Sequence, residues 1–309
     1  MTLVSIVTPS YNQAAFLEQT IRSVLEQDHP ELEYIVVDGG STDGSLEIIR
    51  CHADQLAWWA SEKDSGQAEA INKGMKRARG EIVGWLNSDD MLLPGAIASA
   101  VQGFASRPKA VLVYGDTRAV DAENRTLNVL HYRQLSLADL LCFEIIGQPA
   151  VFMRRSAFEA AGGLDPSYHF MLDHQLWIKI AQQGEIVHVE QVWAAARYHP
   201  GAKNRAQATG FAQEAFRLHE WMHGQAALAS LLKRVERRER ASVQRVNARY
   251  LLDDGQPWPA LRAWMRAFLI HPPTALRRLN LLGSAVLSLA GLGALREAVL
   301  RNRQKRLSR

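Results

Sequence analysis

The sequence predicts an α/β fold in which a mostly parallel sheet carries helices on both of its faces. Three observations favour it: short apolar runs rich in β-branched residues, helical apolar spacing between those runs, and glycine-rich breaks where the runs end. With 309 residues, the chain is long enough for one large or two modest domains. Such sheets bind ligands beyond the carboxyl ends of their strands, so the residues after each strand are the first candidates for a site.

Up to residue 110 the chain alternates strands with helices. Strands are predicted at 4–7, 34–37, 56–59 and 82–86, with helices over 17–25, from 46 and over 68–78. The first helix follows from the apolar residues Leu17, Ile21 and Val24, which recur at helical spacing. Asn12 is a suitable cap for it. This alternation is typical of a parallel sheet.

Beyond residue 110, a section of mixed strands and helices is followed by a section that is helical. Strands are predicted in AVLVYGD, RTLNVLHY, QPAVFMR and EIVHVE. A helix begins near Asp173 and runs to Gly184, a plausible C′ glycine. After Asn204 the pattern is helical almost to the end. Prolines divide this part into short helices: Pro257, Pro259, Pro272 and Pro273.

The composition is that of an ordinary soluble globular protein, with 47% apolar and 22% charged residues. Two cysteines, Cys51 and Cys142, exclude a disulfide framework and show no metal-ligand spacing, which favours a reducing compartment. The segment MTLVSIVTPSYN lacks the basic region and long apolar region of a signal peptide. We therefore expect a cytoplasmic protein.

Charge is distributed unevenly along the chain. Residues 231–309 hold 17 lysines and arginines against five acids, a net charge of +12, while the rest carries −8. Within this basic part, 279–295 is free of charged residues, although a membrane-spanning helix needs about 20 apolar residues. We favour an interfacial helix on an anionic membrane surface, at the inner face of the membrane. A buried helix with a solvated charged tail and a membrane-spanning anchor are the alternatives.

Two adjacent carboxylates, Asp89 and Asp90, follow the strand predicted at 82–86. Side by side they repel each other, which raises one pKa unless a cation neutralises them. Mg²⁺ and Mn²⁺ take carboxylate oxygens, and phosphates of a ligand often complete their shell. The pair therefore suits a metal–diphosphate site, although it also suits a solvated turn ahead of the helix that begins at Pro94.

Another acid, Asp38, follows the strand at 34–37 and opens the segment DGGSTDGS. Glycines allow close backbone approach, and a carboxylate at a strand end can accept hydrogen bonds from a nucleobase or ribose. The segment also fits a plain turn and helix cap. It is no P-loop, because no Gly-Lys-Ser/Thr follows. Asp64 comes just after the third strand, so we expect Asp38, Asp64 and Asp89 at one edge of the sheet.

Charges further along the chain complete the candidate site. Asp173, in FMLDHQLW, suits a general base toward a sugar hydroxyl, or a simple acid at a helix N-terminus. Arg197, His199 and Lys203 follow a predicted strand in ARYHPGAKN. They suit phosphate oxygens, with His199 as a metal ligand, or an exposed basic loop.

Four sequence blocks, in this order and with suitable spacing, resemble family 2 glycosyltransferases of the GT-A fold: IVTPSYN, YIVVDGGSTDGS, SEKDSGQAEAINKGMKRARGEIVGWLNSDD and GQPAVFMRRSAFEAAGGLDPSYHFMLDHQLW. The resemblance covers about two thirds of the chain. It implies a GT-A domain over 1–205, with a nucleotide-sugar-binding half at 1–110 and an acceptor half at 111–205. Residues 206–309 are then a helical, basic C-terminal region.

The resemblance also implies an activity, an inverting transfer of a sugar from a nucleotide-diphosphate donor to a hydroxyl. UDP-sugars are the commoner donors among relatives. The expected acceptor is a glycan or a lipid-linked sugar, in polysaccharide biosynthesis for the cell envelope.

The family's nucleotide-binding positions carry over residue by residue. Pro9 and Tyr11 match the first nucleotide-contacting loop, and Asp38 matches the acid that reads the base. Asp64 would also face the nucleotide. His199 falls in a segment that, in relatives, can close over the diphosphate.

The metal and base positions carry over with two departures. NSDD stands where the family has its metal-binding Asp-x-Asp signature, which makes Asp89 the expected ligand of Mg²⁺ or Mn²⁺, with Asp90 assisting. Asn87 occupies the first position of that signature and is a departure. Asp173 matches the catalytic base, and Leu172 stands where the family commonly has an acid.

Two other classes of function fit part of the sequence. A non-catalytic GT-A-like module would bind a nucleotide-sugar or glycan without turnover, and Asn87 is its best support. A nucleic-acid binder ranks last, because the basic tail has neither interleaved aromatic residues nor a helix-turn-helix pattern. We therefore expect no nucleic-acid partner.

Overall fold

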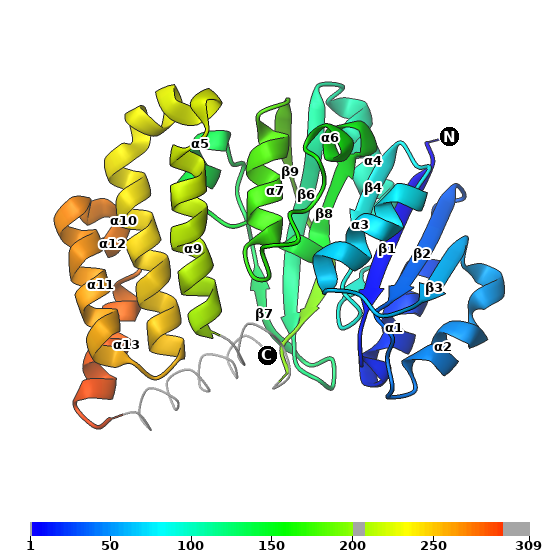
Figure 1. The fold of residues 1–309 in the computed structure, drawn as a ribbon, viewed down its shortest axis with the longest axis horizontal. Helices are drawn as coiled ribbons and strands as arrows, with labels where there is room; N and C mark the ends of the chain where they lie inside the picture. The colour runs from blue at the N-terminus through cyan, green and yellow to red at the C-terminus, as the bar shows by residue number, and fades with distance from the viewer. Residues whose placement is uncertain (1, 200–207, 293–309) are drawn as a thin grey trace. The chain divides into compact units, whose positions relative to one another are not determined.

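The structure is a computed structural model that describes residues 2–199 and 208–292 (Figure 1). The chain divides into two compact units. The first contains the residues up to 136 together with 146–198, and the second contains 137–145 and the described residues from 199 onward. Residue 205, the predicted end of the first domain, lies outside the described residues.

The first unit is built on one sheet. Its strands are β1 (Val4–Ser10), β2 (Leu32–Asp38), β3 (Trp58–Ser61), β4 (Ile82–Trp85), β5 (Met91–Leu92), β6 (Ala110–Val120), β7 (Thr126–Leu130), β8 (Val151–Arg154) and β9 (Glu185–Arg197). The strand order is β3-β2-β1-β4-β8-β6-β9-β5, and β7 pairs with β6. Strands β1 to β4 are parallel, while β8 is antiparallel to both β4 and β6. Because β9 is parallel to β6, it runs in the same direction as β1. The predicted mostly parallel sheet is confirmed.

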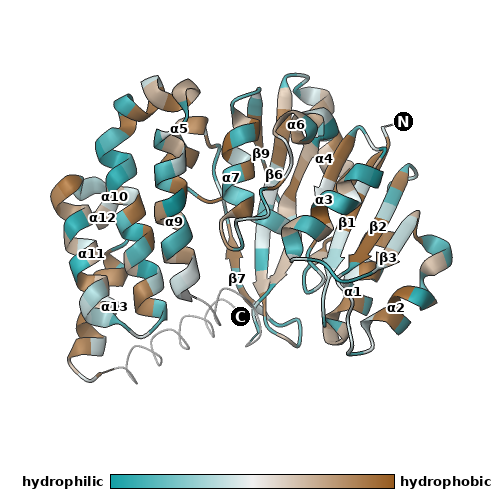
Figure 2. Ribbon diagram, in the orientation of Figure 1, coloured by the Kyte–Doolittle hydropathy of each residue, from teal (hydrophilic) through white to brown (hydrophobic). Residues whose placement is uncertain are grey.

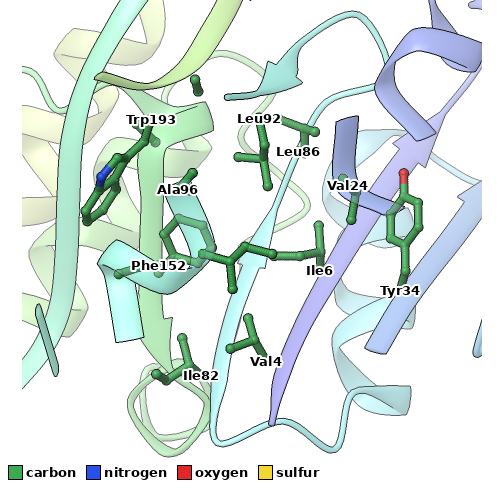
Figure 3. Close-up of a cluster of buried hydrophobic side chains, with 14 of the residues drawn as sticks. Val4, Ile6, Val24, Tyr34, Ile82, Leu86, Leu92, Ala96, Phe152 and Trp193 are labelled. Carbon is green, nitrogen blue, oxygen red and sulfur yellow. The ribbon is translucent and has the colours of Figure 1, made fainter. Parts of the chain in front are cut away.

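Helices cover both faces of this sheet. They are α1 (Ala14–Leu25), α2 (Ser45–Cys51), α3 (Gln67–Arg77), α4 (Ala96–Ser106), α6 (Arg155–Ala160) and α7 (Leu172–Ala181), with 3₁₀ turns at Ala53–Gln55 and Gln148–Ala150. Ile6 of β1 belongs to a core cluster with residues of α1 and α4, and Figure 3 shows it near Phe152 of β8. Successive residues of a strand point to opposite faces, so Val7 faces α3 instead. A Cβ at Gly74 of α3 would lie 2.4 Å from the Val7 Cγ1, so only glycine allows this close packing.

Two local expectations were wrong. Asn12 does not cap α1, because its backbone is left-handed (φ 51°) and the helix begins at Ala14. The Asp43 carboxylate, from the next loop, accepts the Ala14 N–H at 2.9 Å instead. Gly184 is not a C′ glycine, since α7 ends at Ala181 and Gly184 is not left-handed. A Cβ there would lie 2.6 Å from the Val111 Cγ1, so glycine serves close packing.

The second unit is helical, as expected of the C-terminal region. It contains α5 (Leu137–Leu141), α9 (Ala208–His223), a 3₁₀ turn (Ala226–Leu228), α10 (Ala229–Asp253), α11 (Pro257–Ile270), α12 (Pro272–Leu276) and α13 (Leu279–Leu289). Prolines begin α11 and α12, where the absent N–H costs no helical hydrogen bond. Small residues such as Ala241 and Ala267 pack around Trp264, and Figure 2 shows hydrophilic residues along much of α10. Among the described residues, no helix is long and apolar enough to cross a membrane.

Candidate active site

Hydrogen bonds connect the loop after β1 to the loop after β2. The Asn12 N–H donates to the Ser41 Oγ at 2.8 Å, and the Asn12 Oδ1 accepts the Thr42 N–H at 2.9 Å. Asparagine tolerates the left-handed backbone that this exchange needs. Of the two residues predicted to contact a nucleotide here, Pro9 is buried in the strand and Tyr11 is exposed in the loop. The Tyr11 ring is thus accessible to a ligand.

Asp38 ends β2 and organises the loop after it. Its carboxylate is fully buried and accepts hydrogen bonds from the N–H of Ser41 at 2.9 Å and the Oγ of Ser61 at 2.6 Å. The Gly40 N–H at 3.1 Å and the Ser41 hydroxyl add two more. Three of these bonds go to Oδ2 and one to Oδ1. A carboxylate has about four acceptor positions over its two oxygens, so Oδ1 keeps capacity for a further donor.

Asp64 lies beside this loop, as the strand order predicts. A Cβ at Gly39 would come within 2.8 Å of the Asp64 Oδ2, which shows how closely the two segments approach. Burial raises the pKa of Asp64, and the carboxylates of Glu69 and Asp38 raise it further, although the Gly66 N–H opposes this by donating to Oδ1 at 2.9 Å. Two acids from neighbouring strand ends therefore meet at one edge, where a hydrogen-bond donor of a ligand would be favoured.

The turn after β4 places the two adjacent aspartates, Asp89 and Asp90, in different surroundings. Asp90 points inward: it is buried, and its Oδ1 accepts the Arg197 backbone N–H at 2.9 Å. Burial raises its pKa well above the ordinary value, and the neighbouring Asp89 adds to the rise. The Thr20 hydroxyl fixes the backbone, lying 3.0 and 2.7 Å from the carbonyl oxygens of Ser88 and Asp90. Asp89 is only half-buried, so the two carboxylates have different surroundings.

Asn87 is held by two glutamines that the sequence did not single out. Its Oδ1 accepts from the Gln67 Nε2 at 2.6 Å, and its Nδ2 donates to the Gln148 Oε1 at 3.0 Å and to the Asp90 Oδ2 at 3.3 Å. Gln148 in turn donates to the Trp85 carbonyl at 2.9 Å. Both glutamines stand in the blocks DSGQ and GQPA, where a polar amide after a glycine was the available signal. Asn87 therefore braces the turn through its amide hydrogens, which an aspartate lacks.

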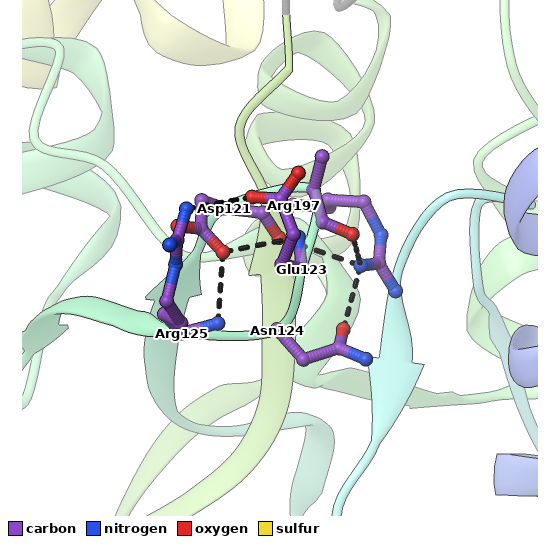
Figure 4. A network of polar contacts seen from close by, with 6 residues as sticks. Asp121, Glu123, Asn124, Arg125 and Arg197 are labelled. Atoms are coloured by element: carbon purple, nitrogen blue, oxygen red, sulfur yellow. Dashed lines mark hydrogen bonds and ion pairs between the residues drawn. The ribbon is translucent and has the colours of Figure 1, made fainter.

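Arg197, at the end of β9, bonds this turn and two other segments, and Figure 4 shows its contact with Asn124. Its Nε donates to the Asp89 carbonyl at 2.8 Å, its Nη1 to the Asn124 Oδ1 at 2.6 Å and its Nη2 to the Gln19 Oε1 at 3.0 Å. The guanidinium also lies 4.6 Å from the centre of the Phe16 ring. Burial lowers the pKa of Arg197, and the charges of the nearby carboxylates oppose that shift. The contact with phosphate stays a prediction, whereas these bonds give Arg197 a bracing role.

Asp173 lies at the start of α7, and the topology places it on the same edge. Helix α7 leads into the beginning of β9, which runs in the direction of β1, so the other end of α7 points to the carboxyl ends of the strands (Figure 1). Trp177, one turn beyond Asp173, stacks on Trp85 of β4 with ring centres 5.1 Å apart. The Asp173 carboxylate is half-buried and accepts the His174 N–H at 2.7 Å.

The last two predicted site residues follow β9 in the sequence. His199 is buried and belongs to the second unit. Lys203 lies outside the described residues. The roles predicted for them in metal and phosphate binding stay predictions.

The chain is similar to known proteins over much of its length. Residues 5–160 match the family model described as Glycosyl transferase family 2. The putative teichuronic acid biosynthesis glycosyltransferase TuaG of Bacillus subtilis is 31% identical over 187 residues, which cover 59% of this chain and 73% of that protein.

Two solved structures share the fold. The mannosyltransferase PcManGT from Pyrobaculum calidifontis, in complex with GDP-Man and Mn²⁺, superimposes with a TM-score of 0.64 at 21% identity, covering 94% of this chain and 87% of that one. TarS residues 1–349 from S. aureus, in complex with UDP-GlcNAc, superimposes with a TM-score of 0.58 at 16% identity, covering 97% and 92%. The expected GT-A fold is confirmed. With the matched family model covering half of its length, the chain belongs to glycosyl transferase family 2, and it is a glycosyltransferase.

Proposed function

We propose that this glycosyltransferase moves a sugar from a nucleotide-diphosphate donor to an acceptor hydroxyl with inversion at the anomeric carbon. The observation that carries the proposal is the shared edge of the sheet. Four acids lie at the carboxyl ends of parallel strands, where such sheets bind ligands. They are Asp38, Asp64, the half-buried Asp89, and Asp173 at the start of α7.

The donor would lie against the joined loops after β1 and β2. The half-buried Asp64 can accept from a hydroxyl or N–H donor of a nucleoside. Asp38 has acceptor capacity left on Oδ1 but is fully buried, so its contact with a nucleoside would require the Ser41 hydroxyl to turn away. The related folds bind UDP-GlcNAc and GDP-Man, and we favour a UDP-sugar. Thermal-shift measurements with UDP, GDP and dTDP, each with and without Mn²⁺, test this. A bound nucleotide stabilises the fold by about 2.7 kcal/mol at a hundredfold excess over Kd.

The residues of the turn after β4 fit a hard divalent cation. Asp89 offers a half-buried carboxylate, whereas Asp90 is bonded inward and the Asn87 Oδ1 already accepts from Gln67. We therefore assign Asp89 as the ligand of Mg²⁺ or Mn²⁺ and Asp90 as its support. When bound, the ion supplies neutralisation of the charge on the departing diphosphate. A nucleotide-induced shift that ignores Mn²⁺ would contradict this assignment.

Asp173 would act as the general base. In the proposed step, the Asp173 carboxylate takes the proton of the acceptor hydroxyl while that oxygen forms a bond to the anomeric carbon. The bond from that carbon to the diphosphate oxygen breaks on the opposite face, which gives inversion. A negative charge is favoured in the first turn of a helix, and the half-buried side chain leaves room for an acceptor to approach.

The decisive experiment compares Asp173→Asn with Glu47→Gln, which removes an exposed acid from the first turn of α2. Loss of a positioned general base typically costs about 10²–10⁴-fold in rate. Asp173→Asn should lose transfer by that factor and keep the thermal shift with nucleotide, while Glu47→Gln keeps both. Equal transfer by the two variants removes Asp173 from the role. Nucleotide binding by the wild type without any turnover favours the non-catalytic module.

We also propose a cell-envelope acceptor reached at a membrane surface. The B. subtilis relative is named for teichuronic acid biosynthesis, which supports a polysaccharide acceptor. Helix α13 exposes Leu279, Val286 and Leu289, and the part of the chain from 231 onward carries a net charge of +12, which suits anionic lipid. Flotation with anionic vesicles should fall when these three residues become serine. Equal flotation of both forms, or equal binding to neutral vesicles, rejects the membrane contact.

A further inference from the structure

Two histidines and a glutamate meet in the second unit. His219 and His223 are four residues apart on α9, so both project from one face of that helix. Glu239 comes from α10 and faces them. The His219 Nδ1 lies 2.6 Å from the Glu239 Oε1, and the His223 Nε2 lies 3.3 Å from the Oε2. Among the described residues, this is the one group of three such side chains whose ligand atoms all lie within 4.8 Å of one another.

The burial of the three residues is graded. Glu239 is fully buried, while the side chains of His219 and His223 are 26% and 40% exposed. A buried carboxylate requires a positive partner or hydrogen bonds, and His219 supplies a hydrogen bond at 2.6 Å. The group is thus anchored by an interior negative charge and open to solvent on its histidine side. An ion can enter from that side without unfolding the helix pair.

We propose that His219, His223 and Glu239 bind one Zn²⁺ ion. Zinc takes imidazole nitrogen and carboxylate oxygen at about 2.0–2.2 Å, and tetrahedral geometry then places ligand atoms roughly 3.3–3.5 Å apart. The His223 Nε2 lies 3.3 Å from one carboxylate oxygen of Glu239, and the His219 Nδ1 lies 2.6 Å from the other. One ligand atom of each residue lies within 4.8 Å of the other two, so the separations have to change by less than about 1.5 Å. Water from the exposed side completes the shell.

The ligand set selects the metal. Imidazole nitrogens favour zinc and its transition-metal neighbours, whereas Mg²⁺ and Ca²⁺ require mostly oxygen ligands. The site is therefore chemically distinct from the all-oxygen turn at Asp89, and it does not depend on the glycosyltransferase mechanism. Because its ligands come from α9 and α10, a bound ion joins the two helices and stabilises the second unit by mass action.

The test uses the untagged full-length protein, stripped with a chelator and titrated with Zn²⁺ in millimolar Mg²⁺, which fills oxygen sites. We expect one zinc per chain. Loss of a residue that only supports a metal ligand typically weakens metal binding by about 10–100-fold. His219→Gln and His223→Gln each remove a ligand itself, so each should weaken zinc binding by at least that factor. Zinc should raise the melting temperature of the wild type and leave that of the double variant unchanged.

Two matched variants should keep the site. His131→Gln removes an exposed histidine that lies 2.6 Å from another buried carboxylate, that of Asp116. Cys51→Ser removes the exposed thiol. Both should bind zinc like the wild type.

Wild-type protein that takes up no zinc, or zinc affinity unchanged in both histidine variants, overturns the site. If a histidine variant fails to fold, Co²⁺ substitution in the wild type decides. Intense visible absorption of four- or five-coordinate cobalt supports the site, and the weak absorption of a six-coordinate ion overturns it.

Discussion

Replacement of Arg197 by methionine tests whether one buried side chain holds the turn that presents Asp89. Methionine keeps much of the apolar stem and the Arg197 backbone N–H bond to Asp90, and it removes only the guanidinium. The guanidinium donates to the Asp89 carbonyl, Asn124 and Gln19, so its loss releases three segments that are far apart in the sequence.

The magnitude follows from the burial of these contacts. Hydrogen bonds from a charged donor contribute about 1.5–3 kcal/mol each, and three of them are not additive because burying the guanidinium has its own cost. Removing one member of a buried charged network typically costs about 3–5 kcal/mol, since its partners stay buried without a donor. In a unit of this size, that loss lowers the melting temperature by roughly 6–20 °C.

Arg125→Met is the matched control, because Arg125 binds the same turn between β6 and β7 from the outside (Figure 4). Its side chain is 73% exposed and pairs with Asp121 and Glu123. Exposed ion pairs contribute little and are screened by salt, so this variant should melt with the wild type. Thermal and urea unfolding, followed by tryptophan fluorescence, measure both. Equal effects of the two substitutions, or a loss at Arg197 that vanishes in high salt, would refute the bracing role.

Two further predictions concern the same unit. Asn87→Asp removes the amide hydrogens that bond Asp90 and Gln148, and it adds a third carboxylate. The metal-free variant should therefore lose about 1–3 kcal/mol of unfolding free energy, and Mn²⁺ should stabilise it more than it stabilises the wild type. Unchanged stability of the variant in chelator contradicts this. Burial alone would raise the pKa of Glu33, but hydrogen bonds from Arg79 and Ser5 outweigh it and lower the pKa below 4.5. Its stabilisation is therefore present above that pH and lost as the pH falls through the lower folded value. Urea unfolding between pH 5 and 3 should show a shallower acid loss in Glu33→Gln than in the wild type, and parallel curves would show that the carboxylate makes no such contribution.

Some strands can be predicted from the sequence and others cannot. β1, β2 and β4 are buried runs of β-branched residues, and such runs predict strands directly. β5 has two residues, too few to carry a pattern. β9 extends beyond its predicted segment because the small residues Ala194 and Ala195 pair with β6, and only the sheet, not their own propensity, makes them a strand. The joining of 137–145 to the second unit likewise depends on tertiary contacts.

The candidate site shows the same limit. The acids at the strand ends could be found because strand order alone brings Asp38 and Asp64 together. The partners that hold such acids come from distant segments, as Arg197 does for the turn after β4, and no local pattern announces them. Among the proposed zinc ligands of the second unit, one pair can be found from the sequence and the third ligand cannot. The spacing of His219 and His223 is visible on one helix, but Glu239 joins them only through the packing of α10 on α9.

The departure at Asn87 has a physical meaning that a motif comparison alone does not contain. Counted as a ligand, asparagine in place of aspartate is a loss of one negative charge from the metal signature. In the structure the residue is a donor, and its amide hydrogens bond the one carboxylate of the pair that is buried. A third carboxylate here would have to face Asp90, whose pKa is already raised by burial and by Asp89. The asparagine therefore lowers the repulsion that the turn must bear before any cation arrives, and it leaves Asp89 as the charge that a cation would find.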